Sequence, residues 1–136
     1  MGDYGKRAGE LFDMGYNCAQ SVLGAFSEKF GMDFDTLIKL SSSFGGGVAG
    51  RREMCGAVSS MLMVIGLGCG YSDSAATVEK QEHYKRCRDA MDEFEKELGS
   101  VVCAELLKKH AGAAHGRPCK AFCELAADIA AEKIGG

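Results

Sequence analysis

The chain has 136 residues, of which 46% are hydrophobic and 26% are charged, and its formal net charge is −3. These values predict one globular domain, residues 1–136, with an apolar core, and they exclude the basic stripe that nucleic-acid binding requires. The longest apolar run, Met61 to Leu67, is too short to span a membrane, and residues 1–10 lack the apolar segment of a signal peptide. We therefore expect a cytoplasmic protein without a membrane span.

The apolar residues recur with helical spacing along the chain, whereas the alternation typical of strands is missing. A single proline, Pro118, also argues against a turn-rich β fold. We therefore predict an all-α fold, a compact single-domain bundle of about six or seven helices. In chain order, the helices are expected from Tyr4 to Asp13, from Asn17 to Gly31, from Asp33 or Asp35 to just before Gly45, from Met54 to Leu67, from Ser74 or Thr77 to Leu98, from Ser100 to the loop Gly112–Pro118, and from Pro118 onward.

The apolar stripe of the longest expected helix is narrow. Its members follow a 3-4-3-4 spacing that is typical of coiled coils: Tyr84, Cys87, Met91, Phe94 and Leu98. This spacing is compatible with a homodimer. It would also suit a non-catalytic interaction module that docks onto a partner through this helix.

Seven cysteines occur in the chain, and in the reducing cytoplasm they favour metal binding or thiol chemistry over a framework of disulfides. Four of them fall at expected helix starts: Cys18, Cys55, Cys103 and Cys119. Backbone N–H groups in the first turn of a helix lack intrahelical partners, and the helix dipole is positive there, so both stabilise a thiolate and lower the pKa of the thiol. If these helix starts converge, they form a thiolate pocket. The alternative is that each cysteine is a small hydrophobic residue of the core.

The other three cysteines are interpreted differently. Cys87 lies in the apolar stripe of the long helix and is expected to pack in the core. Cys69 lies near the end of a helix, where the dipole disfavours a thiolate. Cys123 follows Cys119 by four residues on the same helix face, so it is either buried or serves as an auxiliary ligand or resolving thiol.

A glycine-rich segment from Phe44 to Gly50 precedes Cys55. Its backbone N–H groups, at Gly45, Gly46 and Gly47, could cradle an anion or hydrogen-bond the sulfurs of a cluster beside Cys55. A tight connection between closely packed helices is the alternative, and the segment matches neither a P-loop nor a dinucleotide fingerprint.

The histidines show no metal-ligand spacing and are expected at the protein surface: His83, His110 and His115.

Three segments resemble the family of redox-active proteins named C_GCAxxG_C_C: residues 15–23 (GYNCAQSVL), 44–50 (FGGGVAG) and 55–58 (CGAV). Residues 99–107 and the late Cys119 are similar to the remaining cysteine segments of that family. The resemblance covers nearly the whole chain, and it implies that the four family cysteines correspond to Cys18, Cys55, Cys103 and Cys119. One position departs from the family motif, in which Cys-Gly-Ala is followed, after two further residues, by glycine. Here that residue is Ser60.

The resemblance implies a redox-type protein, and related domains are joined to electron-transfer modules. We therefore expect the four cysteines to hold a 2Fe-2S iron–sulfur cluster, or zinc, and to transfer electrons with an unidentified redox partner protein. The glycines expected to contact this cofactor are Gly45, Gly46, Gly47 and Gly56. Two alternatives remain: a thiol–disulfide oxidoreductase that cycles Cys18 and Cys55, or the non-catalytic interaction module.

Overall fold

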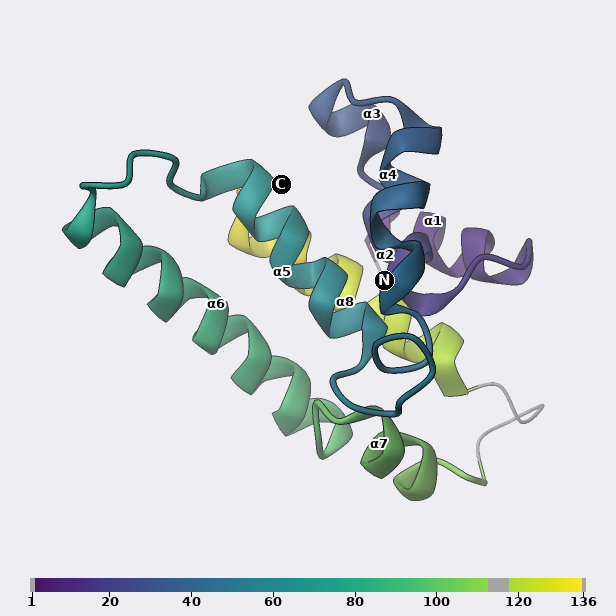
Figure 1. The fold of residues 1–136 in the computed structure, drawn as a ribbon. Helices are drawn as coiled ribbons and strands as arrows, with labels where there is room; N and C mark the ends of the chain where they lie inside the picture. The colour runs from purple at the N-terminus through teal and green to yellow at the C-terminus, as the bar shows by residue number, and fades with distance from the viewer. Residues whose placement is uncertain (1, 113–117, 136) are drawn as a thin grey trace.

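The computed structural model describes residues 2–112 and 118–135, and this part of the chain contains eight α-helices, one 3-10 helix and no β-sheet (Figure 1). The predicted all-α fold is confirmed, with more helices than the six or seven expected. In chain order the elements are α1 (Asp3–Asp13), α2 (Cys18–Gly24), α3 (Ser27–Phe30), α4 (Phe34–Ser41), η1 (Ser42–Phe44), α5 (Gly56–Cys69), α6 (Thr77–Leu98), α7 (Cys103–Lys109) and α8 (Pro118–Lys133). Most of the expected loop Gly112–Pro118, with His115, lies outside the described residues.

The second expected helix is divided in two, which accounts for the additional helix. α2 ends at Gly24, and the chain turns at Ala25 and Phe26 before α3 begins at Ser27. This turn places the Phe26 ring in the core, where it is fully buried and stacks on Tyr4 with 4.3 Å between ring centroids. Burial of this large aromatic side chain stabilises the fold more than continuing the helix would. This is a tertiary effect that the spacing of apolar residues alone does not reveal.

Two other helix starts differ from the prediction for a shared reason. Met54 pairs with Val102 in an isolated antiparallel bridge, so both segments are extended where helices were expected. As a result, α5 begins at Gly56 instead of Met54. Val102, rather than the predicted Ser100, is the N-cap of α7.

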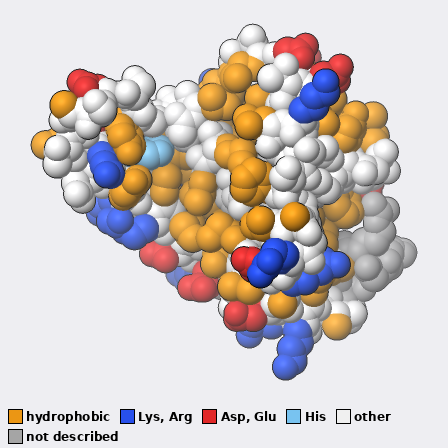
Figure 2. Space-filling model, viewed as in Figure 1, with side chains coloured by type: hydrophobic (Ala, Val, Ile, Leu, Met, Phe, Trp, Pro, Cys, Tyr) orange, Lys and Arg blue, Asp and Glu red, His pale blue; other side chains and the backbone are white. Residues whose placement is uncertain are grey.

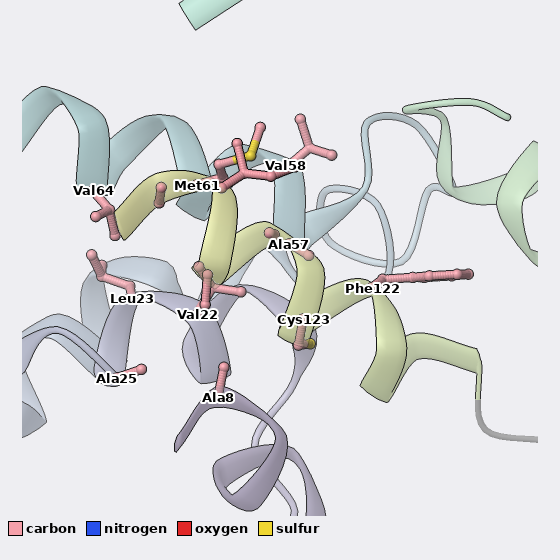
Figure 3. Packing of buried hydrophobic residues seen from close by; sticks show 14 of the residues in the cluster. Ala8, Val22, Leu23, Ala25, Ala57, Val58, Met61, Val64, Phe122 and Cys123 are labelled. Atoms are coloured by element: carbon pink, nitrogen blue, oxygen red, sulfur yellow. The ribbon is translucent and has the colours of Figure 1, made fainter. Parts of the chain in front are cut away.

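α5 is the central helix of the bundle. It lies between α2 and α6, and α8 runs behind it in the view of Figure 1. Its buried side chains share one hydrophobic cluster with those of α2 and α8, and Figure 3 shows Met61, Val22 and Phe122 among its members. Because neighbouring helices cover α5 on several sides, its residues are apolar nearly all round.

α6 is the longest helix, and its second half packs on the body of the molecule. Ala90 and Phe94 are buried there, whereas Val78 and Tyr84 in the first half are 64% and 45% exposed. The first half therefore extends beyond the bundle (Figure 1). Among the described residues, no helix combines the length and the apolar character that crossing a membrane requires.

Candidate functional site

Four helix N-termini meet at a cavity of about 140 Å³ between α2, α5, α7 and α8, called the cysteine pocket below. Each terminus contributes one cysteine to its lining: Cys18 is the first residue of α2, Cys55 the N-cap of α5, Cys103 the first residue of α7 and Cys119 the second residue of α8. The structure thus brings together the four cysteines whose convergence the sequence left open. The rest of the lining is mainly apolar, from Phe12, Leu106, Leu107 and Phe122, with Arg52 and Asn17 as polar members.

Close contact between α2 and α5 sets the positions of the first two cysteines. A Cβ at Gly56 would lie 2.7 Å from the Phe44 carbonyl oxygen and 3.2 Å from the Ala19 nitrogen, so the absence of a side chain permits this approach. One turn later, the buried Ser60 hydroxyl donates to the Ala19 carbonyl oxygen at 2.7 Å. Both positions therefore act on the residue that follows Cys18. Serine is small enough for this contact and adds a hydrogen bond to it.

The loop before α5 and the start of α7 are joined by backbone hydrogen bonds. The N–H groups of Cys103 and Ala104 donate to the carbonyl oxygens of Glu53 and Arg52 at 2.6 and 3.2 Å. Gly47 makes room for this contact, because its φ is +70° and a Cβ there would lie 2.6 Å from the Cβ of Cys103. These bonds occupy the first N–H groups of α7 and hold Cys103 beside the loop.

Three of the four glycines predicted to contact a cofactor line the cysteine pocket: Gly46, Gly47 and Gly56. Gly45 packs against the side chain of Asn17 instead. The carbonyl oxygens of residues 45–47 accept hydrogen bonds from N–H groups further along the same loop, at residues 50, 52 and 53. The loop therefore folds onto itself through the carbonyl oxygens of these three glycines.

The thiols of Cys18, Cys119 and Cys123 form one group of neighbours. Cys119 and Cys123 both affect the pKa of Cys18, and Cys18 affects the pKa of Cys119. The Cys123 thiol donates to the Cys18 carbonyl oxygen at 3.7 Å. Cys123 is fully buried, whereas Cys18 and Cys119 are partly exposed. Cys123 therefore holds α8 against α2 from the inside, and Cys18 and Cys119 lie next to each other at the opening.

Burial and mutual proximity keep these thiols protonated, so the predicted lowering of the pKa is wrong for three of them. Interaction with Cys119 lowers the pKa of Cys18. Cys123, burial and the other neighbouring thiols raise it, and their combined effect is larger, so the net shift is upward. Interaction with the Cys18 thiol, burial and the charge of Cys18 raise the pKa of Cys119. Burial raises the pKa of Cys55 to about 11, although N–H groups of the first turn of α5 lower it. At Cys55 the helix N-terminus acts as expected, but removal of the thiol from water outweighs it, whereas at Cys18 and Cys119 the neighbouring thiols and then burial raise the pKa.

Among the described residues that line the cysteine pocket, Arg52 is the one with a positively charged side chain. Its Nη1 donates to the sulfur of Cys103 at 3.7 Å. Its φ of 61° lies in the left-handed region, as do those of Val48 and Ala49 in the same loop. Such backbone strain in residues other than glycine is concentrated at functional sites, where the surrounding structure maintains it. Cys103 is thereby the pocket cysteine with a positively charged partner.

Two adjacent arginines, Arg51 and Arg52, follow the glycine-rich segment, and neither is among the site residues predicted from the sequence. The structure separates them, because Arg51 points to solvent and pairs with Glu53 at 2.9 Å, whereas Arg52 reaches the pocket. A positive charge close to a predicted thiol site is a usable signal. The choice between the two arginines depends on the left-handed turn, which the sequence does not reveal.

The donor chemistry of the cysteine pocket suits a thiophilic metal, because four thiols line one cavity. The arrangement of the donors does not suit it. Within residues 2–112 and 118–135, no group of three or more Cys, His, Asp or Glu side chains is placed to hold a metal ion. A metal would also have to displace the protons that the raised pKa values keep on the thiols. Thiol–disulfide exchange at this pocket would likewise require a thiol to lose its proton, because the thiolate is the attacking form.

The other described cysteines and histidines lie outside the pocket lining. Cys69 and Cys87 are partly exposed and pack at the edge of the core. Cys87 lies beside His83, with 3.6 Å between the sulfur and Nε2. His110, which was expected at the surface, is half-buried, and its ring packs edge-on against Phe122 at 5.3 Å.

A family model described as "Putative redox-active protein (C_GCAxxG_C_C)" matches residues 16–133. The matched range contains the four cysteines of the pocket and the contacts of Gly56 and Ser60 with α2. The comparisons with curated proteins and with solved structures found no match.

Proposed function

The chain belongs to the C_GCAxxG_C_C family of redox-active proteins, and we propose that its redox centre is the thiol pair Cys18 and Cys119. This pair cycles between two thiols and one disulfide. The observation that carries the proposal is that Cys18 and Cys119 line the same cavity and that each thiol strongly affects the pKa of the other, which places them side by side.

Access to solvent also favours this pair. Cys18 and Cys119 are partly exposed, whereas Cys55 and Cys103 are only 3% and 8% exposed. An incoming disulfide therefore reaches the first two thiols more readily than the others. Because the thiol of Cys119 affects the pKa of Cys18 far more strongly than Cys55 does, the proposal pairs Cys18 with Cys119 instead of Cys55.

The oxidant is a disulfide, RS–SR, of a small molecule or of a partner protein. The sulfur of Cys119, the less buried of the pair, attacks one sulfur of RS–SR, and the RS⁻ that leaves takes up the proton lost by Cys119. The sulfur of Cys18 then attacks Cys119 in the mixed disulfide. The Cys18–Cys119 bond forms, and the second RS⁻ leaves with the Cys18 proton. Two electrons and two protons pass from the protein to the oxidant, which becomes two RSH.

Arg52 stabilises the negative charge that develops during this exchange. Interaction with the Cys18 thiol and burial raise the pKa of Cys119, and the charge of Arg52 opposes them. The guanidinium lines the same pocket and donates a hydrogen bond to Cys103. Its charge therefore acts on Cys119 while its hydrogen bond is made to Cys103.

Peptide mapping tests the pairing. The reduced protein is treated with glutathione disulfide, the remaining thiols are alkylated, and the chain is digested with trypsin without reduction. Trypsin cleaves after Lys120 and so separates Cys119 from Cys123. We expect the Cys18 peptide joined to the Cys119 peptide, and loss of this link on addition of dithiothreitol. The Cys119→Ser variant should lose the link and the Cys123→Ala control should keep it. A link to Cys123, or no link, contradicts the proposal.

A second candidate function is binding of a 2Fe-2S cluster or zinc by the four pocket cysteines, with a role in electron transfer. The observation that favours it is the presence of four thiols around one cavity. Anaerobic purification followed by analysis of iron, sulfide and zinc tests it. Stoichiometric metal, together with protection of the four thiols from alkylation, would support this function over the dithiol cycle. Natively folded protein that is free of metal would exclude it.

A further inference from the structure

α6 carries an exposed stripe of residues beside the stripe that packs in the core. The core-facing residues recur three or four positions apart: His83, Cys87, Ala90 and Phe94. A second stripe, called the outer stripe below, has the same spacing one position later: Tyr84, Arg88, Met91 and Glu95. Residues with this spacing share one face of a helix. Arg88 and Glu95 are exposed, Tyr84 is 45% exposed and Met91 is half-buried, so this face of α6 is open to solvent.

Apolar surface continues from the outer stripe onto the end of α5. Tyr71, two residues after α5, is exposed, and its ring packs edge-on against Tyr84 with 6.5 Å between ring centroids. Leu67, in the last turn of α5, is also exposed. Figure 2 shows hydrophobic side chains along the hollow between α6 and the body of the molecule. An exposed apolar surface with charged neighbours of this kind is typical of a protein–protein interface.

The charges of α6 are distributed unevenly along the helix. Residues 77–88 include four basic and two acidic side chains, whereas residues 89–98 include five acidic and one basic. The helix dipole favours the reverse order, because it is positive at the N-terminus and negative at the C-terminus. Stabilisation of α6 itself therefore does not account for this order of charges. A second α6 that runs in the opposite direction has the complementary order.

The charges of the outer stripe are available for contact with a partner. Elsewhere on α6, Glu93 accepts a hydrogen bond from Lys133 of α8 at 3.1 Å. Asp89 pairs with Lys85, one turn earlier, at 2.9 Å. Among the residues that the structure describes, neither Arg88 nor Glu95 has an ion-pair partner or a side-chain hydrogen bond.

We propose that the outer stripe is the interface of a homodimer, in which α6 of one protomer packs antiparallel to α6 of its partner, with the two-fold axis beside Met91. Met91 lies three residues after Arg88 and four residues before Glu95. An axis at Met91 therefore brings Arg88 of each protomer next to Glu95 of the other, because a two-fold interface repeats every contact. A parallel arrangement would instead place like charges side by side.

The same axis pairs apolar residues. Tyr84 lies seven residues before Met91, and the half-buried Leu98 lies seven residues after it. In the antiparallel dimer each Tyr84 meets Leu98 of the partner, and the two helices overlap over about 20 Å, at ~1.5 Å per residue. The apolar contacts supply the buried area, and the charged positions beside them set the orientation. The proposal does not depend on the Cys18–Cys119 cycle, because none of the residues that line the cysteine pocket belongs to α6.

Sedimentation equilibrium of the full chain tests the dimer, with reductant present so that no disulfide joins two copies. We expect the mass to rise with protein concentration from the 14.4 kDa of one chain to twice that value. A chain that remains monomeric over the whole concentration range overturns the proposal.

Reversal of single charges tests the antiparallel arrangement. Arg88→Glu and Glu95→Arg should each raise the dissociation constant of the dimer about tenfold, because each variant creates two pairs of like charges across the axis. The double variant restores both pairs with the signs exchanged, so we expect its dissociation constant within about threefold of the wild-type value.

Glu97→Arg is the matched control, because it makes the same change two residues later on another face of α6. It should change the dissociation constant by no more than about twofold. Circular dichroism confirms that each variant is folded. Single variants that dimerise like the wild type, or a double variant as weak as the single ones, overturn the antiparallel pairing.

Discussion

Ser60 links α5 to α2 beside the cysteine pocket, and replacing it tests how that contact is stabilised. Its hydroxyl is fully buried and donates to the Ala19 carbonyl oxygen at 2.7 Å. Ser60→Ala removes this hydrogen bond, which should lower the free energy of unfolding by about 1 kcal/mol. Ser60→Gly restores the family motif but also places a glycine inside a helix, which costs about 1 kcal/mol more. We therefore expect Ser60→Gly to be destabilised by about 2 kcal/mol.

Urea unfolding followed by circular dichroism measures these differences, with reductant present so that no disulfide forms during the transition. The expected order of stability is wild type, then Ser60→Ala, then Ser60→Gly. For a chain of this size, each 1 kcal/mol corresponds to roughly 3 °C in Tm. Ser59→Ala, at the half-buried neighbouring position, is the control and should change the free energy of unfolding by no more than about 0.5 kcal/mol.

A Ser60→Gly variant as stable as the wild type would refute this reasoning. It would show that the hydroxyl contributes nothing measurable and that α5 needs only a small residue where it meets Ala19. A destabilised Ser60→Ala together with an unaffected Ser60→Gly would contradict the account in the same way, because both variants lose the same hydrogen bond.

Arg52→Gln should slow alkylation of Cys103 about fivefold, because an exposed charge interaction contributes about 1 kcal/mol, whereas Arg51→Gln should leave the rate unchanged. Peptide mass analysis over time measures both rates, and equal rates in the two variants would contradict the assignment. The free energy of unfolding of the reduced protein should fall as pH rises from 9.0 to about 11, because the unfolded Cys55 thiol ionises near pH 9.0 while burial raises the pKa of the folded thiol to about 11. This contribution is fully present below pH 9.0, and urea titrations of Cys55→Ala should show a smaller fall; an equal fall in both proteins would assign the effect to other groups. Phe26→Ala should cost about 3–5 kcal/mol in urea unfolding, since a fully buried ring leaves a cavity, and a loss below about 1 kcal/mol would show that the turn before α3 does not depend on that ring.

The features that local chemistry determines could be predicted from the sequence. Asn17 caps α2 as expected, and it does so through a reciprocal pair of hydrogen bonds with Gln20 at 2.9 and 3.1 Å. Gly99 ends α6 in the left-handed conformation, as its position after Leu98 predicts. Such signals involve residues within one turn of each other, so the cysteines at helix starts could be located along the chain.

The features that depend on distant segments could not be predicted in this way. The division of α2 from α3 follows from the burial of Phe26 against Tyr4. The late start of α7 follows from the pairing of Met54 with Val102. Neither contact can be recognised from the spacing of apolar residues along the sequence.

The protonation of the thiols is the largest difference between the sequence analysis and the structure. A helix N-terminus lowers the pKa of a thiol, and this local effect is visible in a sequence. Burial and the proximity of thiols on other helices raise the pKa of Cys18, Cys55 and Cys119, and these effects exist only after α2, α5 and α8 have packed together. The sign of the net shift therefore depends on the tertiary structure.

An equilibrium redox titration of the Cys18–Cys119 pair tests the central claim most directly. The protein is equilibrated anaerobically over a range of ratios of reduced glutathione to glutathione disulfide, quenched with acid, and mapped by mass spectrometry. We predict that the fraction of the peptide joining Cys18 to Cys119 follows a single reversible two-electron curve and that the joined peptide is absent from Cys119→Ser. Free Cys18 and Cys119 thiols at every ratio would contradict the account.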